Sequence, residues 1–258
     1  MEKVGIIIPA HNEEKRIGET LKVYSEFFEN LKKTKQADCL LFVVINGSND
    51  RTNQIVTEFS KKHKILDFID LKRGGKGYAV TQGFNLLLQR DFDLIGFVDA
   101  DLATSPEEFY KLIQNIKHSD AIIASRYLKN SKVFPKATFR RLIVSRVFNI
   151  LIRTLLFLPY RDTQCGAKLF KKESIKKALP KITFSQWAFD VDLLYQIRKL
   201  GFQIREFPTV WVDKEYSKIN FWRSGPWMAL AIIRLRLIHS PFKGFVKFYD
   251  AFLSKLWK

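Results

Sequence analysis

The sequence predicts an α/β protein with a Rossmann-like, mostly parallel central sheet, followed by amphipathic helices at the C-terminus. Short, continuous apolar runs alternate with amphipathic segments through the first half of the chain, as expected for buried parallel strands and the helices that cover them. The 258 residues are 47% hydrophobic and 27% charged, so the chain is too apolar to be disordered and long enough to bury one large core.

The first half predicts five strands joined by four helices. Each strand is an uninterrupted apolar run, and the helices repeat apolar residues at helical spacing, as Ile17, Leu21 and Phe28 do. The expected strands are Val4–Ile8, Leu40–Ile45, Ile65–Leu71, Leu94–Val98 and Ala121–Ser125. The expected helices are Glu13–Asn30, Thr52–Lys62, one from the Arg73–Gly77 turn to about Gln89, and Pro106–Lys117, which has a proline at its start.

The second half predicts longer helices and fewer strands. A long apolar helix over Phe139–Leu158 carries a polar stripe of Arg141, Ser145 and Asn149 at intervals of four residues. The remaining expected elements are a turn at Asp162–Gly166, a strand at Ala167–Phe170, a helix around Asp190–Leu200, a strand at Phe202–Trp211, and helices at about Phe221–His239 and Phe242–Trp257.

The charge is distributed unevenly along the chain. Residues 1–128 are net neutral, and residues 129–258 carry the whole formal charge of +18, which indicates an anionic partner such as nucleic acid, lipid headgroups or a phosphorylated substrate. The two cysteines predict neither a disulfide framework nor a zinc site. No signal-peptide pattern and no apolar run long enough to span a bilayer is present, so we expect a cytoplasmic location.

Polar residues of ligand type follow all five strands of the first half. Ligands of parallel sheets bind beyond the carboxyl ends of the strands, so we expect these residues to converge there. They are Pro9–Glu13, Asn46–Asp50, Lys72–Gly77, Asp99–Asp101 and Arg126.

Two of these strand ends predict phosphate chemistry. Asp99 and Asp101 are ligands of the kind that Mg²⁺ or Mn²⁺ takes together with substrate phosphates, although an Asp-x-Asp pair on its own is mostly solvated. The Gly74–Gly77 turn opens a helix, where backbone N–H groups with Lys72 and Lys76 can hold a phosphate; a turn that merely tolerates positive φ is the alternative. No Gly-x-Gly-x-x-Gly follows the first strand, which argues against a dinucleotide oxidoreductase.

Motifs over roughly residues 4–240 resemble glycosyltransferase family 2, a family of inverting enzymes with the GT-A fold. Those in the first half are Pro9-Ala10-x-Asn12-Glu13, Asn46-Gly47-Ser48-x-Asp50, Lys72-x-x-Gly75-Lys76-Gly77 and Asp99-x-Asp101. Those in the second half resemble the dolichyl-phosphate β-glucosyltransferase branch and, in general plan, other polyprenyl-phosphate hexose synthases: Asp162-Thr163-Gln164-Cys165-Gly166-x-Lys168-Leu169-Phe170, Trp187–Leu194 and Ser217-Lys218.

The resemblance implies a catalytic domain over residues 1–220, with a nucleotide-sugar half (1–128) and an acceptor half (129–220). For residues 221–258 we expect amphipathic membrane-interface helices, on the residue pattern described below. It implies that Asp99 and Asp101 hold Mg²⁺ or Mn²⁺, and that the nucleotide sugar is bound by Pro9, Ala10, Asn12, Glu13, Asn46, Ser48, Lys72, Lys76, Asp99, Ala100 and Asp101. Asn46 stands where an aspartate is usual, and it can still accept a hydrogen bond from a uracil N–H. Ala103 stands where the mannose synthases carry a metal-binding amide, which favours the glucosyl branch.

The implied reaction transfers glucose from UDP-glucose to a polyprenyl or dolichyl phosphate. This acceptor is ionised at neutral pH, so it needs cations to position it and no general base. The implied acceptor-binding residues are Arg126, Arg140, Arg141, Ser145, Gln164, Trp187 and Lys218, and the implied catalytic residues are Asp101, Arg126 and Asp190. In relatives that glycosylate hydroxyls, a carboxylate in the region of Asp190 serves as a base. In this sequence the alternative role of Asp190 is to position the sugar or an arginine.

Three other functions stay open at this point: a GDP-mannose-dependent lipid-phosphate transferase, a hydroxyl-acceptor member of the family, and a basic nucleic-acid-binding protein. The last lacks a recognisable basic motif or aromatic platform, and its basic residues lie beside amphipathic helices. We therefore expect an anionic membrane surface, and not nucleic acid, as the partner.

The C-terminal residues predict an interfacial helix. Phe242, Phe245 and Tyr249 fall on one face of it, and Lys243 and Lys247 fall on the other. We expect peripheral attachment to the cytoplasmic face of a membrane through residues 221–258 and the Phe139–Leu158 helix; packing of these helices on the sheet domain is the alternative.

Overall fold

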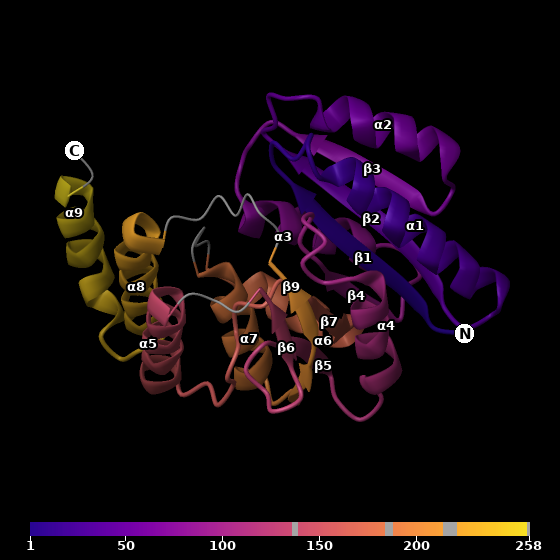
Figure 1. Cartoon of the computed structure of the whole chain (residues 1–258). Coiled ribbons are helices and arrows are strands. Elements are labelled where there is room, and N and C mark those ends of the chain that lie inside the picture. The colour runs from indigo at the N-terminus through magenta and orange to yellow at the C-terminus, as the bar shows by residue number, and fades with distance from the viewer. Residues whose placement is uncertain (136–138, 184–187, 214–220, 257–258) are drawn as a thin grey trace.

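The structure, a computed structural model, describes residues 1–135, 139–183, 188–213 and 221–256, without the side chains of 139–144, 221–224, 226 and 252–256 (Figure 1). Its strands are β1 (Lys3–Ala10), β2 (Asp38–Asn46), β3 (Leu66–Leu71), β4 (Leu94–Phe97), β5 (Ala121–Ser125), β6 (Lys132–Phe134), β7 (Lys168–Lys171), β8 (Ile204–Pro208) and β9 (Val210–Val212). Its helices are α1 (Ile17–Lys33), α2 (Thr52–Lys62), α3 (Lys76–Leu88), α4 (Pro106–Asn115), α5 (Phe139–Leu156), α6 (Lys172–Ala178), α7 (Phe189–Lys199), α8 (Phe221–Ile238) and α9 (Val246–Leu256), with short 3₁₀ helices at Leu179–Lys181 and Lys243–Phe245.

Seven strands form one sheet in the order β3-β2-β1-β4-β7-β5-β8. Six of them are parallel, and β7 runs antiparallel to its two neighbours, β4 and β5. The predicted fold class, a mostly parallel α/β sheet, is therefore confirmed. Because residues from both sides of position 128 contribute strands, residues 1–128 and 129–258 share one sheet.

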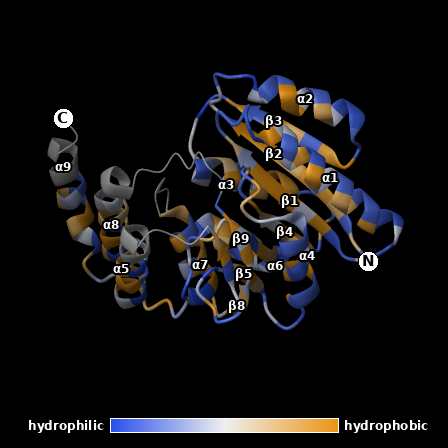
Figure 2. Cartoon of the chain, in the orientation of Figure 1, coloured by the Kyte–Doolittle hydropathy of each residue, from blue (hydrophilic) through white to orange (hydrophobic). Residues whose placement is uncertain are grey.

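The sheet is covered on both faces, and the strands alternate between two apolar cores (Figure 2). Ile6 and Ile8 of β1 face a core that α1, α2 and α4 complete, whereas Ile7 faces a core completed by α3, α6 and α7. This alternation follows from the two-residue repeat of a strand. Since both faces are buried, the strands have no polar face, which is why they read as continuous apolar runs.

The predicted strand at Phe202–Trp211 is wrong in one respect: it breaks at Thr209. β8 remains in the central sheet, and β9 leaves it to pair with β6, a three-residue strand that the apolar pattern did not predict. The buried Glu108 carboxylate holds the break, because it accepts hydrogen bonds from the Thr209 hydroxyl (3.1 Å) and the Val210 amide (2.9 Å). Helix α6 also went unpredicted, since its seven residues are too few to show a clear period.

Helices α5, α8 and α9 lie side by side at the end of the molecule opposite α2 (Figure 1). Tyr249 and Asp250 of α9 bind α8, through hydrogen bonds to the Leu230 carbonyl (2.8 Å) and from the Arg234 guanidinium (2.7 Å). Among the described residues, no helix is both long and apolar enough to cross a membrane.

The C-terminal end of α8 is attached to α7. The His239 ring stacks on Tyr195 of α7, with ring centroids 4.8 Å apart. Its Nε2 lies 2.9 Å from the Gln196 amide nitrogen and 3.6 Å from the buried Asp192 carboxylate. The α8–α9 pair is thus fixed to the same helix whose first turn carries Asp190.

Candidate active site

The loops after β1, β2, β3 and β4 converge at one edge of the sheet. Strand β1 lies between β2 and β4, with Ile7 opposite Phe97, so the segment after Ala10 lies beside Asp99. This is the point where the strand order reverses direction along the chain, which is where open α/β sheets bind ligands. The expected convergence of the first-half motifs is therefore observed.

Side-chain-to-backbone hydrogen bonds join the first two loops. The Asn12 amide N–H donates to the Ser48 hydroxyl (3.1 Å), and the Asn12 side-chain oxygen accepts from the Asn49 amide (2.8 Å). The Glu13 amide donates to the Thr52 hydroxyl (2.8 Å), while the Glu13 carboxylate holds the Arg16 guanidinium at 2.6 Å. These contacts fix the loops without using the exposed atoms of Pro9.

Asn46 lies beneath the loops, with 1% of its surface exposed. The Asn46 side-chain amide is oriented so that its Nδ2 donates to the Ala10 carbonyl (2.8 Å) and its Oδ1 accepts from the Gly75 backbone N–H (3.0 Å). Both polar atoms of the side chain are thus used to join β1 to the turn before α3. Lys72, which follows β3 at the same edge of the sheet, is exposed.

Asp99 and Asp101 occupy a turn that α1 holds in place. The buried Thr20 hydroxyl donates to the Ala100 carbonyl (2.7 Å), and the Ala103 amide donates to Asp101 Oδ1 (3.0 Å). Burial and the neighbouring Asp99 charge raise the pKa of Asp101, since both disfavour its ionised form. The turn therefore concentrates negative charge that a cation would stabilise.

The described part of the chain contains no cluster of three or more His, Cys, Asp or Glu side chains that could hold a metal. A divalent cation at this edge would therefore be held by Asp99 and Asp101, with water and substrate phosphate oxygens supplying its other ligands, which is the usual arrangement for Mg²⁺. The two crowded carboxylates fit such an ion.

Two lysines and Asp190 extend this cluster into the protein. The Lys76 ammonium lies 2.6 Å from Asp99 Oδ1, and the Lys168 ammonium donates to Asp190 Oδ1 (2.7 Å) and to the Cys165 carbonyl (2.6 Å). Both ammonium groups lie over the Phe97 ring, at 5.7 and 5.1 Å from its centroid.

The charges in this cluster stabilise one another. Burial alone would lower the pKa of Lys76, but the Asp99 and Asp190 carboxylates outweigh it and raise that pKa. Burial alone would raise the pKa of Asp190, but Lys168 and Lys76 outweigh it and hold that pKa below its ordinary value. Asp190 is therefore anionic and weakly basic.

Lys168 is the site residue that sequence reasoning missed. Parallel strands bring their carboxyl ends to this edge, whereas β7 is antiparallel and contributes its first residue to the same edge. The sequence carries a signal for it, since a lysine interrupts the apolar run Ala167–Phe170. The structure shows that this lysine has no exposed surface (0%).

Three expected acceptor residues come together beside this cluster. The Arg126 side chain donates to both oxygens of the buried Asp162 carboxylate (2.7 and 3.0 Å). The backbone N–H of Gln164 donates to the same carboxylate (3.2 Å). Ser145 shares a hydrogen bond with the hydroxyl of Tyr127, the residue next to Arg126. The side chains of Arg140 and Arg141 lie outside the described residues, as do Trp187 and Lys218.

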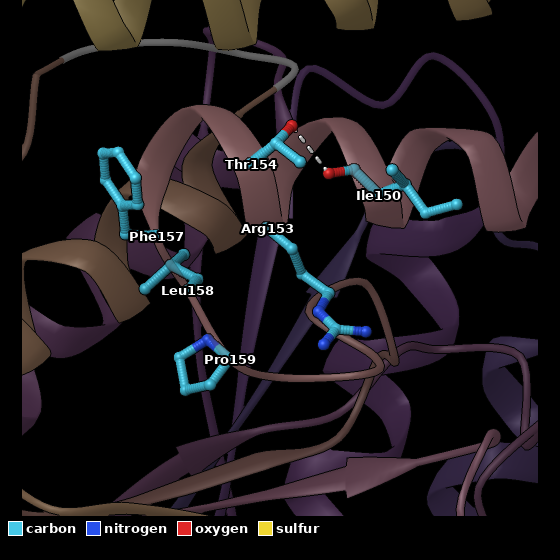
Figure 3. Close-up of a pocket in the computed structure, with 6 residues that line it drawn as sticks. All are labelled: Ile150, Arg153, Thr154, Phe157, Leu158 and Pro159. Carbon is cyan, nitrogen blue, oxygen red and sulfur yellow. Dashed lines mark hydrogen bonds between the residues drawn. The ribbon is translucent and has the colours of Figure 1, made fainter.

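A separate surface pocket of about 380 Å³ lies at the C-terminal end of α5 (Figure 3). It is lined by Ile150, Arg153, Thr154, Phe157, Leu158 and Pro159, and the Thr154 hydroxyl is turned back onto the Ile150 carbonyl (2.9 Å). None of its lining residues belongs to the charged cluster, so this pocket is distinct from the candidate active site.

Residues 5–179 match the family model described as glycosyl transferase family 2. The chain is 32% identical over 243 residues to a dolichyl-phosphate beta-glucosyltransferase of Dictyostelium discoideum, covering 90% of this chain and 73% of the relative. It is 33% identical to the protein of the same name from Drosophila melanogaster, with 85% of this chain and 70% of the relative covered.

Solved structures show the same fold at low sequence identity. A glucosyl-3-phosphoglycerate synthase from Mycobacterium tuberculosis, in complex with Mn²⁺, UDP and glucosyl-3-phosphoglycerate, superposes with a TM-score of 0.64 at 16% identity, covering 92% of this chain and 79% of that one. A mannosyltransferase from Pyrobaculum calidifontis, in complex with GDP-Man and Mn²⁺, gives 0.63 at 16% identity, covering 98% and 70%.

The Arg126–Asp162 pair predicts a large loss of stability on Asp162→Ala. The variant leaves the guanidinium without its counter-ion, so urea unfolding at pH 7 should show a loss of about 3–5 kcal/mol. Burial alone would raise the pKa of Asp162, but Arg126 outweighs this effect and lowers that pKa. The stabilisation by the pair is therefore fully present above the pKa of the unfolded carboxyl. It is lost in acid as the pH falls through the lowered pKa of the folded state. Asp91→Ala, which removes an exposed surface pair with Lys3, is the control and should leave the urea midpoint nearly unchanged. Equal effects of the two variants would contradict the prediction.

Proposed function

The chain belongs to glycosyl transferase family 2 and is a hexosyltransferase, and we propose that it transfers glucose from UDP-glucose to a polyprenyl or dolichyl phosphate with inversion. The observation that carries the proposal is the Asp99–Asp101 turn facing Lys76 at the sheet edge, together with the relatives' names. The product is a lipid-phosphate β-glucose.

The donor binds across the converged loops in this proposal. Pro9, Asn12 and Ser48 would border the nucleoside. Asp99 and Asp101 would hold Mg²⁺ or Mn²⁺, which would neutralise charge on the departing diphosphate. The Lys76 ammonium adds a second positive charge at the same place. Asn46 acts indirectly, by holding the Ala10 and Gly75 backbones in position.

The acceptor phosphate approaches from the side of Arg126 in this proposal. One of its oxygens forms a bond to C1 of glucose as the bond from C1 to the diphosphate breaks, and no proton has to move. Arg126 is held at a fixed orientation by Asp162 and lies over the Trp211 ring at 5.3 Å from its centroid. A cation fixed in this way can orient a phosphate without blocking its attacking oxygen.

Label transfer tests the donor and acceptor together. The protein is incubated with polyprenyl phosphate and radiolabelled UDP-glucose, UDP-galactose or GDP-mannose, and label in the organic phase is counted. We expect label from UDP-glucose. Label from GDP-mannose and not from UDP-glucose would show that the donor is GDP-mannose. Absence of organic-phase label from every donor would refute the lipid-phosphate acceptor.

Asp101→Ala should abolish transfer without unfolding the protein. Loss of this ligand leaves the departing diphosphate uncompensated, so we expect a decrease in kcat of roughly 100-fold or more. EDTA should inhibit the wild-type enzyme in the same assay. Asp93→Ala, an exposed carboxylate at the other end of β4, is the matched control. Transfer that survives both Asp101→Ala and EDTA would remove the metal from the proposal.

We also propose that residues 221–258 and α5 rest on the cytoplasmic face of a membrane. Three phenylalanines before and within α9 stay largely exposed: Phe242 (63%), Phe245 (60%) and Phe248 (75%). Val147 and Ile150 of α5 are exposed as well, and Lys243 and Lys247 are interleaved with the phenylalanines. Exposed aromatics beside lysines suit the interface of an anionic bilayer.

Reversing charge at Lys243 and Lys247 together, to Glu, should weaken binding to anionic liposomes. At ~1 kcal/mol per basic residue, loss of the two positive charges alone amounts to roughly a 30-fold decrease in partitioning, measured by flotation, and the two added negative charges should increase the effect. Reversal of Lys61 and Lys62, which are exposed at the end of α2, is the matched control and should change little. Equal flotation of both double variants would show that these helices do not face the membrane.

A further inference from the structure

Lys168 is a buried ammonium group in the middle of the candidate active site. Its side chain has no exposed surface (0%), and its partners are the Asp190 carboxylate (2.7 Å) and the Cys165 carbonyl (2.6 Å). Placing an ammonium group in a protein interior costs several kcal/mol unless close partners offset it. A lysine in this position therefore calls for a role that a smaller apolar residue could not perform.

The partner of Lys168 is only partly buried. The Asp190 side chain is 15% exposed and contacts Lys168, and it also interacts electrostatically with Lys76, which pairs with Asp99. Asp190 comes from the first turn of α7 and Lys168 from the start of β7. Their contact is therefore a tertiary interaction and is not imposed by the local backbone.

We propose that Lys168 is a positioning residue that keeps Asp190 a permanent anion, and that it thereby restricts the enzyme to acceptors that arrive already ionised. The inference rests on the proposed function and specifies its acceptor class. A hydroxyl or a water molecule must lose a proton as it attacks C1, and a carboxylate bound to a buried ammonium takes up that proton poorly. A phosphate monoester has no such proton to lose.

Removal of the lysine charge should release the suppressed chemistry. In Lys168→Gln, a water oxygen forms the bond to C1, the bond from C1 to the diphosphate breaks, and the electron pair leaves with UDP. The proton of the water passes to Asp190 and then to solvent, and the products are glucose and UDP. No other reactant is required.

The experiment measures glucose released from UDP-glucose without any lipid acceptor. We expect Lys168→Gln to hydrolyse UDP-glucose at least about 10-fold faster than the wild type, since a positioned base contributes about 10²–10⁴-fold. Lys171→Gln removes a partly exposed lysine at the other end of β7, is the matched control, and should stay at the wild-type rate. The double variant Lys168→Gln with Asp190→Asn should lose the gain. This distinguishes hydrolysis catalysed by the Asp190 base from hydrolysis caused by greater access of water to the site.

Two outcomes would overturn the inference: unchanged hydrolysis in a Lys168→Gln protein that still binds UDP, or a gain that persists in the double variant. If Lys168→Gln does not fold, the wild-type enzyme still decides, because transfer to a polyprenol in place of polyprenyl phosphate would contradict the restriction. The hydrolysis comparison uses no lipid, so failure of the lipid-phosphate proposal is seen separately, in the label-transfer assay.

Discussion

The ion pair between Lys168 and Asp190 is the interaction on which the rest of the site depends. It belongs to a chain of alternating charges in which Lys168, Asp190, Lys76 and Asp99 come from four different elements, β7, α7, α3 and the end of β4. Removing one member of such a buried pair leaves an uncompensated charge, which costs about 3–5 kcal/mol. The same interaction therefore joins the first turn of α7 to the start of β7 and places a fixed pair of charges beside the Asp99–Asp101 turn.

Most of residues 1–128 could be predicted from the sequence, because their structure follows from local patterns. The apolar runs correspond to β1–β5, and the polar residues after Ala10, Asn46, Leu71 and Phe97 converge as parallel strand ends must. Lys168 and the burial of Asn46 could not be predicted in this way. The first depends on a strand that enters the sheet in the opposite direction, and the second depends on which loop covers another, and neither is encoded in a local period.

The structure of residues 129–258 was harder to predict from sequence patterns. A three-residue strand such as β6 has no measurable alternation, and the break at Thr209 is set by Glu108, a residue about one hundred positions earlier in the chain. The C-terminal helices were read correctly as helices. Their amphipathic pattern, however, does not distinguish a face that packs on protein from one that stays exposed: Ile232 and Leu235 of α8 are buried, whereas Phe245 and Phe248 are not.

The antiparallel strand also has a consequence for how the chain folds during synthesis. β4 hydrogen-bonds to β1 on one side, and its other edge is covered only by residues 168–171. Until those residues leave the ribosome, a nascent chain that already contains β1–β5 presents an unpaired apolar edge in the middle of its future sheet, the kind of edge that recruits other strands. Residue 128 divides the motifs of this sequence, but it cannot be a boundary between independently folding units.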